Sequence, residues 1–288
     1  MKLWNKQQEI LFFKNSQNFA SINQLFNESE DGRYFAYWPK NNRGKRTTLQ
    51  SRNSLIGKSS EKWVADLFNS LIEDENLFVI QQAQIPAIGI TYNSPADVVI
   101  STKEKKVLRP EDVKVIFEVK MSVVWNWEYD IFTNSLTEIG DYRTHKGKPS
   151  FTRSDSILKA IGKCIDIRVS NWKASKIPLV VLGNAPLSMD LQKGGLFKKC
   201  RYHSGLLVSQ SISRNHGNTR KNSSKKGFIR FDDACELKSR LADMFQEDLN
   251  FFSGMKNPTE LGKLIEMANN EKNYQQKGLK FLKLINRS

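Results

Sequence analysis

Three ionisable side chains lie near the ends of two apolar segments, and their types and spacing suit the hydrolysis of a phosphodiester bond. Asp97 lies near the start of the segment 94–100, and Glu118 and Lys120 end the segment 113–120. Two carboxylates that converge at a strand end offer the hard oxygen ligands that Mg²⁺ prefers. A neighbouring lysine can orient a water molecule and offset the charge that develops on a phosphate. Metal, water and lysine together would hydrolyse the phosphodiester.

The two apolar segments must position these groups. Both are rich in β-branched residues, and the charged link between them contains Pro110, which predicts two adjacent and mostly buried strands. Side chains alternate across a strand, so Glu118 and Lys120 project from one face and Val119 from the other. A hairpin-like pairing would bring Asp97 close to them. The alternative is an ordinary salt bridge at the surface end of a buried strand, because Glu-x-Lys alone is a common pattern.

Asp97, followed on the next apolar segment by Glu118-Val119-Lys120, resembles the core motif of the PD-(D/E)xK nuclease superfamily, which includes most type II restriction endonucleases. The strict motif has proline immediately before the aspartate, whereas this chain reads Pro95-Ala96-Asp97. The resemblance covers roughly residues 55 to 185. It implies an α/β fold in which a restriction-endonuclease-like core, with a mixed central β-sheet flanked by helices, carries helical N- and C-terminal additions.

The resemblance also implies roles for individual residues. Asp97, Glu118 and the backbone carbonyl of Val119 would bind Mg²⁺, with Mn²⁺ as a substitute, and Lys120 would position the attacking water. Members of the superfamily often carry a glutamate on the first core helix that faces the metal, which makes Glu61 a candidate auxiliary ligand through water. The alternative places Glu61 in the first turn of a helix expected over 59–72, where it would interact only with the helix dipole.

The net charge of +15, from 45 Lys and Arg against 30 Asp and Glu, indicates a polyanionic partner. An acidic membrane surface and simple solubility are the alternatives, but no single basic amphipathic helix dominates, so nucleic acid is favoured, and the resemblance implies double-stranded DNA. The chain lacks the run of roughly 18 apolar residues that a membrane span needs. It shows no signal-peptide pattern at its start and no zinc spacing among its cysteines. We therefore expect a protein of the prokaryotic cytoplasm that does not associate with membranes.

Two basic segments are candidate DNA contacts. The segment 193–226 is rich in Lys and Arg and has no Asp or Glu, so it is expected to act as a recognition insertion that becomes ordered on DNA. A shorter basic loop spans 40–46. The alternative for each is a solvated loop. The residues expected to contact DNA are Arg43, Lys45, Arg46, Arg153, Arg201, Arg214, Arg220 and Lys221.

The expected organisation is an N-terminal helical and loop extension over 1–53, a catalytic core over 54–232 that includes the insertion 193–226, and a C-terminal helical region over 233–288. The hydrophobic content of 39% supports a folded core. Besides the helix and the two strands already described, further elements are expected. Helices are predicted over 155–169, 232–252, 258–270 and 278–285, and strands over 77–80, 177–183 and 227–231.

The sequence therefore predicts a Mg²⁺-dependent, sequence-specific endonuclease that cleaves double-stranded DNA, most simply a type II restriction enzyme. A palindromic site would call for a homodimer, because protein symmetry then mirrors DNA symmetry. Two alternatives remain open. The first is a repair, junction-resolving or transposition endonuclease with the same core. The second is a non-catalytic DNA-binding module in which the Asp-Glu-Lys set is only a structural ion pair.

Overall fold

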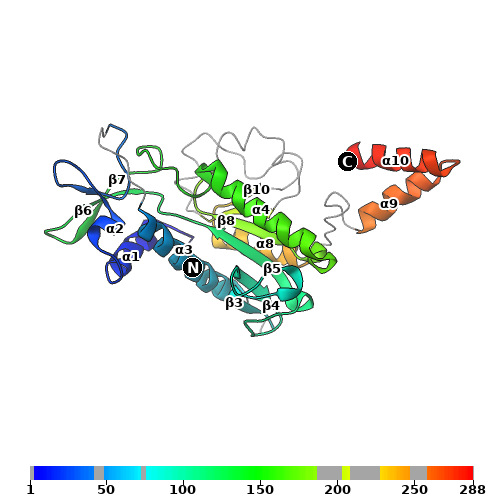
Figure 1. Cartoon of the computed structure of the whole chain (residues 1–288), viewed down its shortest axis with the longest axis horizontal. Helices are drawn as coiled ribbons and strands as arrows, with labels where there is room; N and C mark the ends of the chain where they lie inside the picture. The colour runs from blue at the N-terminus through cyan, green and yellow to red at the C-terminus, as the bar shows by residue number, and fades with distance from the viewer. Residues whose placement is uncertain are drawn as a thin grey trace.

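The computed structural model describes residues 3–41, 49–72, 76–186, 203–207, 228–246 and 258–287. Within these residues the chain forms an α/β structure with two β-sheets (Figure 1). The larger, mixed sheet has six strands in the order β10-β9-β8-β5-β4-β3, and the smaller, antiparallel sheet has four in the order β1-β2-β6-β7. The predicted α/β class and mixed central sheet are confirmed.

The strands of the larger sheet are β3 (Phe78–Ala83), β4 (Ala96–Ser101), β5 (Val113–Lys120), β8 (Leu179–Gly183), β9 (His203–Leu207) and β10 (Phe228–Phe231). Those of the smaller sheet are β1 (Asn27–Glu28), β2 (Tyr34–Phe35), β6 (Asn126–Asp130) and β7 (Ser135–Gly140). The α-helices are α1 (Lys6–Ser16), α2 (Ile22–Leu25), α3 (Gln50–Leu71), α4 (Ser154–Ser170), α8 (Ala234–Gln246), α9 (Pro258–Asn269) and α10 (Tyr274–Arg287).

The middle of the larger sheet is an antiparallel meander of β3, β4 and β5, to which β8, β9 and β10 add in parallel. β4 and β5 read as nearly continuous apolar runs because both of their faces are covered. Their register pairs Val98 with Phe117 and Val99 with Ile116. Continuing that register by one residue sets Asp97 opposite Glu118, at the end of the strand pair.

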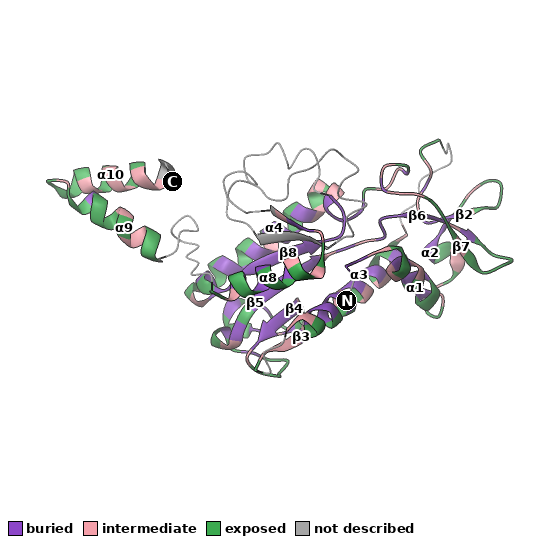
Figure 2. Cartoon of the chain, turned by 180° about the vertical axis from the view of Figure 1, so that it is seen from behind, coloured by how far each residue is buried: buried purple, intermediate pink, exposed green. Residues whose placement is uncertain are grey.

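Helices cover both faces of this sheet. Phe68 of α3 packs on Phe117 of β5, with ring centroids 4.4 Å apart, whereas Lys163 of α4 reaches Glu118, the next residue of the same strand. Because neighbouring residues of a strand point to opposite faces, α3 and α4 lie on opposite sides of the sheet. Figure 1 shows the sheet between them, and Figure 2 shows the mostly buried strands β4, β5 and β8 in purple.

Helix α3 is longer than the sequence predicts. The serines and the glycine before residue 61 favour a start near Ser59, but the helix begins at Gln50 and carries Gly57 in its interior. The helix dipole acts mainly within the first turn, and Glu61 lies well past that turn. The interpretation of Glu61 as a residue that only interacts with the dipole is wrong.

The N-terminal residues form more than helices and loops. Asn27 pairs with Phe35, and Tyr34 pairs in turn with Tyr129 of β6, so β1 and β2 extend a sheet that starts after the β5 strand end. The aromatic segment 34–39 is strand-like in sequence, and β2 lies at its start, so strands accompany the helices and loops expected over 1–53. Such a two-residue strand pairs with a segment far away in the chain, and no local sequence pattern indicates that pairing.

A buried carboxylate joins the N-terminal region to the chain after β5. Glu9 of α1 is fully buried and accepts hydrogen bonds from the indole N–H groups of Trp4 (3.1 Å) and Trp127 (2.9 Å). The backbone N–H groups of Val124 (2.6 Å) and Trp125 (3.2 Å) donate to the same carboxylate. Burial raises the pKa of Glu9 to about 7, and these four donors oppose the rise.

The C-terminal helices follow the prediction closely in type. α8 packs against the larger sheet, whereas α9 and α10 pack on each other and lie apart from both sheets (Figure 1). Among the residues of these two helices whose burial is described, Ala268 alone is buried. The predicted end of the 232–252 helix lies outside the described residues. None of the helices described is both long and apolar enough to cross a membrane.

Candidate active site

A row of polar side chains crosses the meander at one end of the sheet. β3 and β4 pair Gln81 with Val98 and Ala83 with Ala96, which sets Gln82 beside Asp97. The β4–β5 register then sets Asp97 opposite Glu118. The side chains of paired residues share one face of a sheet, so the two carboxylates predicted from the sequence lie next to each other.

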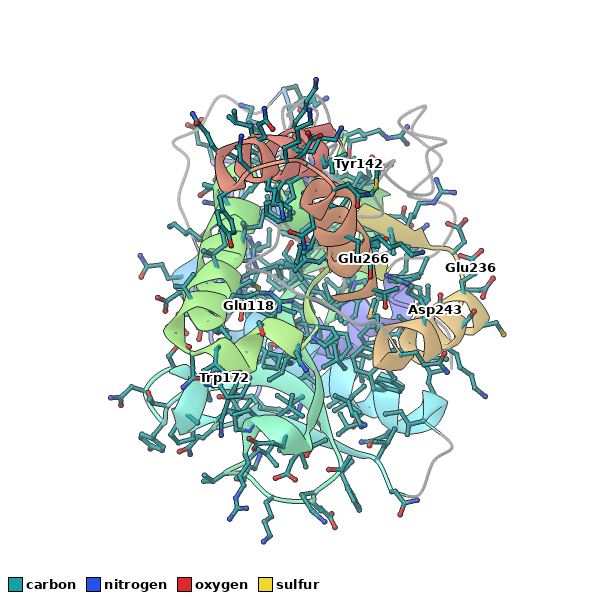
Figure 3. All side chains as sticks on the ribbon, turned by 90° about the vertical axis from the view of Figure 1, so that its right-hand side faces the viewer. Glu118, Tyr142, Trp172, Glu236, Asp243 and Glu266 are labelled. Carbon is teal, nitrogen blue, oxygen red and sulfur yellow. The ribbon has the colours of Figure 1, made fainter. Side chains whose placement is uncertain are left out.

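Two ammonium groups surround Glu118, whose side chain is 8% exposed. Lys120, from the same strand, donates to its Oε1, and Lys163 of α4 lies 2.6 Å from its Oε2. The Lys163 Nζ is also 4.0 Å from Asp97 Oδ1. The Lys163 ammonium therefore occupies a position from which a cation contacts both Asp97 and Glu118. Figure 3 labels Glu118 in the interior, beside α4.

The neighbouring charges shift the pKa values of Asp97 and Glu118 in opposite directions. Burial, followed by the nearby charge of Glu118, raises the pKa of Asp97 to about 7. Burial also disfavours the charged form of Glu118, but the ammonium groups of Lys120 and Lys163 outweigh burial and hold its pKa below the usual range. Two carboxylates whose pKa values are pushed apart in this way are typical of functional sites and also of structural ion-pair networks.

The Asp97 carboxylate also fixes the backbone of β5, because its Oδ2 accepts a hydrogen bond from the Val119 N–H at 2.7 Å. The carbonyl oxygen of Val119 faces the Lys120 ammonium, 3.4 Å from its Nζ. Lys120 is 30% exposed, so its ammonium contacts both the buried carboxylate and solvent. The structure therefore brings together the residues Asp97, Glu118, Val119 and Lys120 that the sequence singles out.

Glu61 approaches this cluster from α3. Its Oε2 accepts a hydrogen bond from Gln82 Nε2 at 2.5 Å, and burial raises its pKa, with smaller electrostatic contributions from Lys120 and Glu118. Gln82 has a φ of +53°, a conformation that is costly for a residue with a side chain. Strained backbone next to clustered charge is a feature of functional sites.

Sequence reasoning missed Lys163. Its position on α4 falls between Ala160 and Ile167, at the edge of the stripe of residues that packs on the sheet. A lysine at the edge of an apolar helix face is the signal that could have found it. Burial disfavours its charge, but the two carboxylates outweigh burial and raise its pKa, so it stays cationic.

Of the predicted DNA contacts, the structure describes Arg153. It is exposed just before α4 and forms an ion pair with Asp155, with Nη2 2.7 Å from Oδ2. The other predicted contacts, Arg43, Lys45, Arg46, Arg201, Arg214, Arg220 and Lys221, lie outside the described residues.

The oxygen atoms gathered around Asp97 and Glu118 are ligands that suit a hard divalent cation. Asp97 and Glu118 offer carboxylate oxygens, Val119 a carbonyl, and Glu61 a further carboxylate near the cluster. Among the residues described, no group of three or more His, Cys, Asp and Glu side chains is gathered closely enough to form a metal site by itself. Such an ion would keep several of its waters, as Mg²⁺ usually does.

Comparison of the chain with protein-family models, with curated proteins and with solved structures found no match.

Proposed function

We propose that this chain is a Mg²⁺-dependent endonuclease of the PD-(D/E)xK type that cleaves double-stranded DNA, with Mn²⁺ as a substitute metal. The observation that carries the proposal is the cross-strand opposition of Asp97 and Glu118, with Lys120 beside them at the end of an antiparallel meander. The raised pKa of Asp97 adds support, because a carboxylate held next to a second carboxylate gains most from a bound cation.

The proposed roles follow from the geometry. Asp97, Glu118 and the Val119 carbonyl hold the metal, with Glu61 acting through water. Bound there, Mg²⁺ would lower the pKa of a coordinated water and stabilise the negative charge that develops on the phosphate. Lys120 orients the attacking water. Because Lys163 lies against both carboxylates, its ammonium has to move away when the metal binds.

The finer proposal is a type II restriction enzyme that acts as a homodimer on a palindromic site. The charge of +15 and the acid-free segment 193–226 support it, since sequence reading needs basic elements beyond the catalytic core. A repair, junction-resolving or transposition endonuclease would use the same core.

A non-catalytic DNA-binding module is the second candidate. Both oxygens of Glu118 are engaged by lysine ammonium groups, which is the arrangement expected of a structural ion-pair cluster. In that case the cluster would stabilise the strand end, and DNA would bind without being cut.

Plasmid DNA incubated with the protein and Mg²⁺ separates these candidates. Discrete fragments support the restriction enzyme, and smeared or structure-selective products support a repair-type nuclease. DNA binding without cleavage, in the wild type as in a Lys120→Ala control, supports the module. Cleavage that persists unchanged in Lys120→Ala would remove this site from the reaction.

A further inference from the structure

A cavity of about 380 Å³ adjoins Lys120. Segments far apart in the chain form its walls: Tyr37 and Trp38 from the N-terminal region, Arg52 from the first turns of α3, and the loop 146–150 before α4. A water molecule takes up roughly 30 Å³ of liquid, so the cavity has room for a group of many atoms.

The lining of this cavity is cationic. The Lys and Arg residues among the described lining residues are Arg52, Lys120, Lys146, Lys148 and Arg153. The same set of described lining residues contains no Asp or Glu. Lys120 and Arg153 are ion-paired with Glu118 and Asp155, whereas the charges of Arg52 and Lys148 would be balanced by an anion inside the cavity.

Arg52 is the strongest indication of an anion, because it is only 5% exposed. Its Nη1 donates to the carbonyls of Leu25 and Ala36, and the guanidinium lies over the ring of Tyr37, 4.7 Å from the centroid. Within the described part of the chain, no carboxylate forms an ion pair with it. Burial lowers the pKa of Arg52, and the nearby Tyr37 and Glu9 oppose that shift. A buried cation is costly without a counter-charge.

The cavity is held in shape by close contacts. Ser150 has a φ of +45°, and its hydroxyl donates to the Lys120 carbonyl and accepts from the Asn184 N–H at 3.2 Å. A Cβ on Gly147 would lie 2.3 Å from the Tyr37 ring, so the loop packs directly on that side chain. These contacts fix the loop against the end of β5, and a preorganised wall lowers the entropy that binding costs.

We infer that this cavity binds a phosphate group of a DNA strand, next to the phosphate that meets Asp97, Glu118 and Lys120. The assignment of DNA as the source of the phosphate rests on the proposed nuclease function. Arg52 supplies the buried charge, Lys148 and Arg153 supply charge at the rim, and Lys120 links the cavity to the carboxylates. A phosphate is the group that these planar and point-like cations recognise.

Calorimetric titration with inorganic phosphate in EDTA tests the cavity without metal and without cleavage. We expect Arg52→Gln and Lys148→Gln each to weaken phosphate binding at least about fivefold. Lys114→Gln, an exposed lysine at the opposite end of β5, is the matched control and should bind as the wild type does. If Arg52→Gln fails to fold, the exposed Lys148→Gln still decides. Equal affinity of Lys148→Gln and the control overturns the inference.

Two duplexes distinguish the source of the phosphate. One carries 5′-phosphates and the other carries only hydroxyl ends, and both are titrated in EDTA over a range of salt. A Lys148-dependent preference for the phosphorylated duplex assigns the cavity to a terminal phosphate, and equal affinity assigns it to an internal phosphodiester. In either case Lys148→Gln should reduce the salt slope by roughly 0.9.

These results are independent of the nuclease test. Phosphate binding that depends on Lys148, in a protein that never cuts DNA, would retain the cavity and remove the proposed function. DNA cleavage in a protein whose phosphate binding is unaltered by Lys148→Gln would retain the proposed function and remove the phosphate site in the cavity.

Discussion

The ammonium group of Lys163 lies 2.6 Å from the Glu118 carboxylate, so a residue of α4 supplies the counter-charge for a buried residue of β5. The same ammonium lies 4.0 Å from Asp97. In the absence of metal, this contact keeps two neighbouring carboxylates compatible with the fold. A cation that binds there must therefore compete with Lys163.

Lys163→Gln should tighten the binding of Mg²⁺, because it removes a positive charge that competes for both carboxylates. A unit charge about 4 Å away is worth ~4 kcal/mol at an effective dielectric of ~20, so a gain of at least about tenfold is expected. Calorimetric titration without DNA measures it. Lys159→Gln, exposed on the same helix, is the control. An affinity that is the same in both variants would place the metal elsewhere.

Asp97→Asn should abolish cleavage without lowering stability. An asparagine can still accept the hydrogen bond from the Val119 N–H through its amide oxygen, and it removes the repulsion from Glu118. The free energy of unfolding at pH 8 is therefore expected to rise by roughly 1 kcal/mol. Urea denaturation and a plasmid cleavage assay give the two readings. Loss of stability together with activity would identify a structural ion pair.

Two substitutions of Gln82 separate the cost of its strained backbone from the loss of its hydrogen bond to Glu61. Gln82→Ala loses the hydrogen bond and keeps the positive φ, whereas Gln82→Gly loses the hydrogen bond and relieves the strain. We expect the glycine variant to be about 1 kcal/mol more stable than the alanine variant in urea denaturation. Equal stability would mean that the backbone at residue 82 relaxes when its side chain is removed.

Two glycines should respond to alanine in opposite directions. A Cβ on Gly183 would lie 2.6 Å from the Phe151 ring and 2.7 Å from Ser150 Oγ, so Gly183→Ala should cost about 1–3 kcal/mol. Gly162 in α4 has open space around it, and Gly162→Ala should stabilise the helix by up to about 1 kcal/mol. Thermal melting of both variants checks the pair. A stable Gly183→Ala protein would show that the loop before α4 shifts readily.

His145 should make the protein less stable in acid. The Gly147 N–H donates to its Nδ1 at 3.0 Å, so its Nε2 carries the proton and donates to the Val124 carbonyl at 3.3 Å. Burial lowers its pKa to about 4, so the folded state binds fewer protons than the unfolded state between pH 6.5 and 4. Stability is therefore lost as the pH falls through that range, by roughly 3 kcal/mol.

The difference between the wild type and His145→Phe isolates this contribution. Phenylalanine keeps a ring next to Tyr37, on which His145 stacks with centroids 4.1 Å apart, but it cannot take up a proton. The carboxyl groups of Glu9 and Asp97, whose pKa values are raised, act in the opposite direction in both proteins and cancel in the difference. A difference in unfolding free energy that does not vary with pH would contradict a neutral, buried His145.

The sequence predicts the meander well because its signals are local. The apolar run from Val113 to Lys120 ends in charged residues, and the structure places β5 on those same residues. Alternation along that strand also predicts the shared face of Glu118 and Lys120. The register that sets Asp97 opposite Glu118 follows from burying both apolar runs, so the core of the candidate site could be predicted.

The remaining features depend on contacts between distant parts of the chain. Gly57 suggests a helix break, but the packing of Trp63, Val64 and Phe68 favours a continuous α3 in spite of it. The approach of Lys163 to Glu118 depends on how α4 crosses the sheet. The cavity beside Lys120 needs Arg52 and the loop at residue 147 to meet, and neither segment carries a signal for the other.

The environment of Glu9 has a consequence for synthesis. Its carboxylate lies among donors that include the N–H of Val124, 115 residues further along the chain. Because the N-terminus leaves the ribosome first, α1 and Trp4 emerge long before the donors of residues 124–127. Some packing partners follow early, since Phe13 of α1 stacks on Phe26, but three of the four donors to Glu9 come only with residues 124–127. The Glu9 carboxylate thus gains its full set of hydrogen bonds only after the strand that ends in Lys120 has been translated.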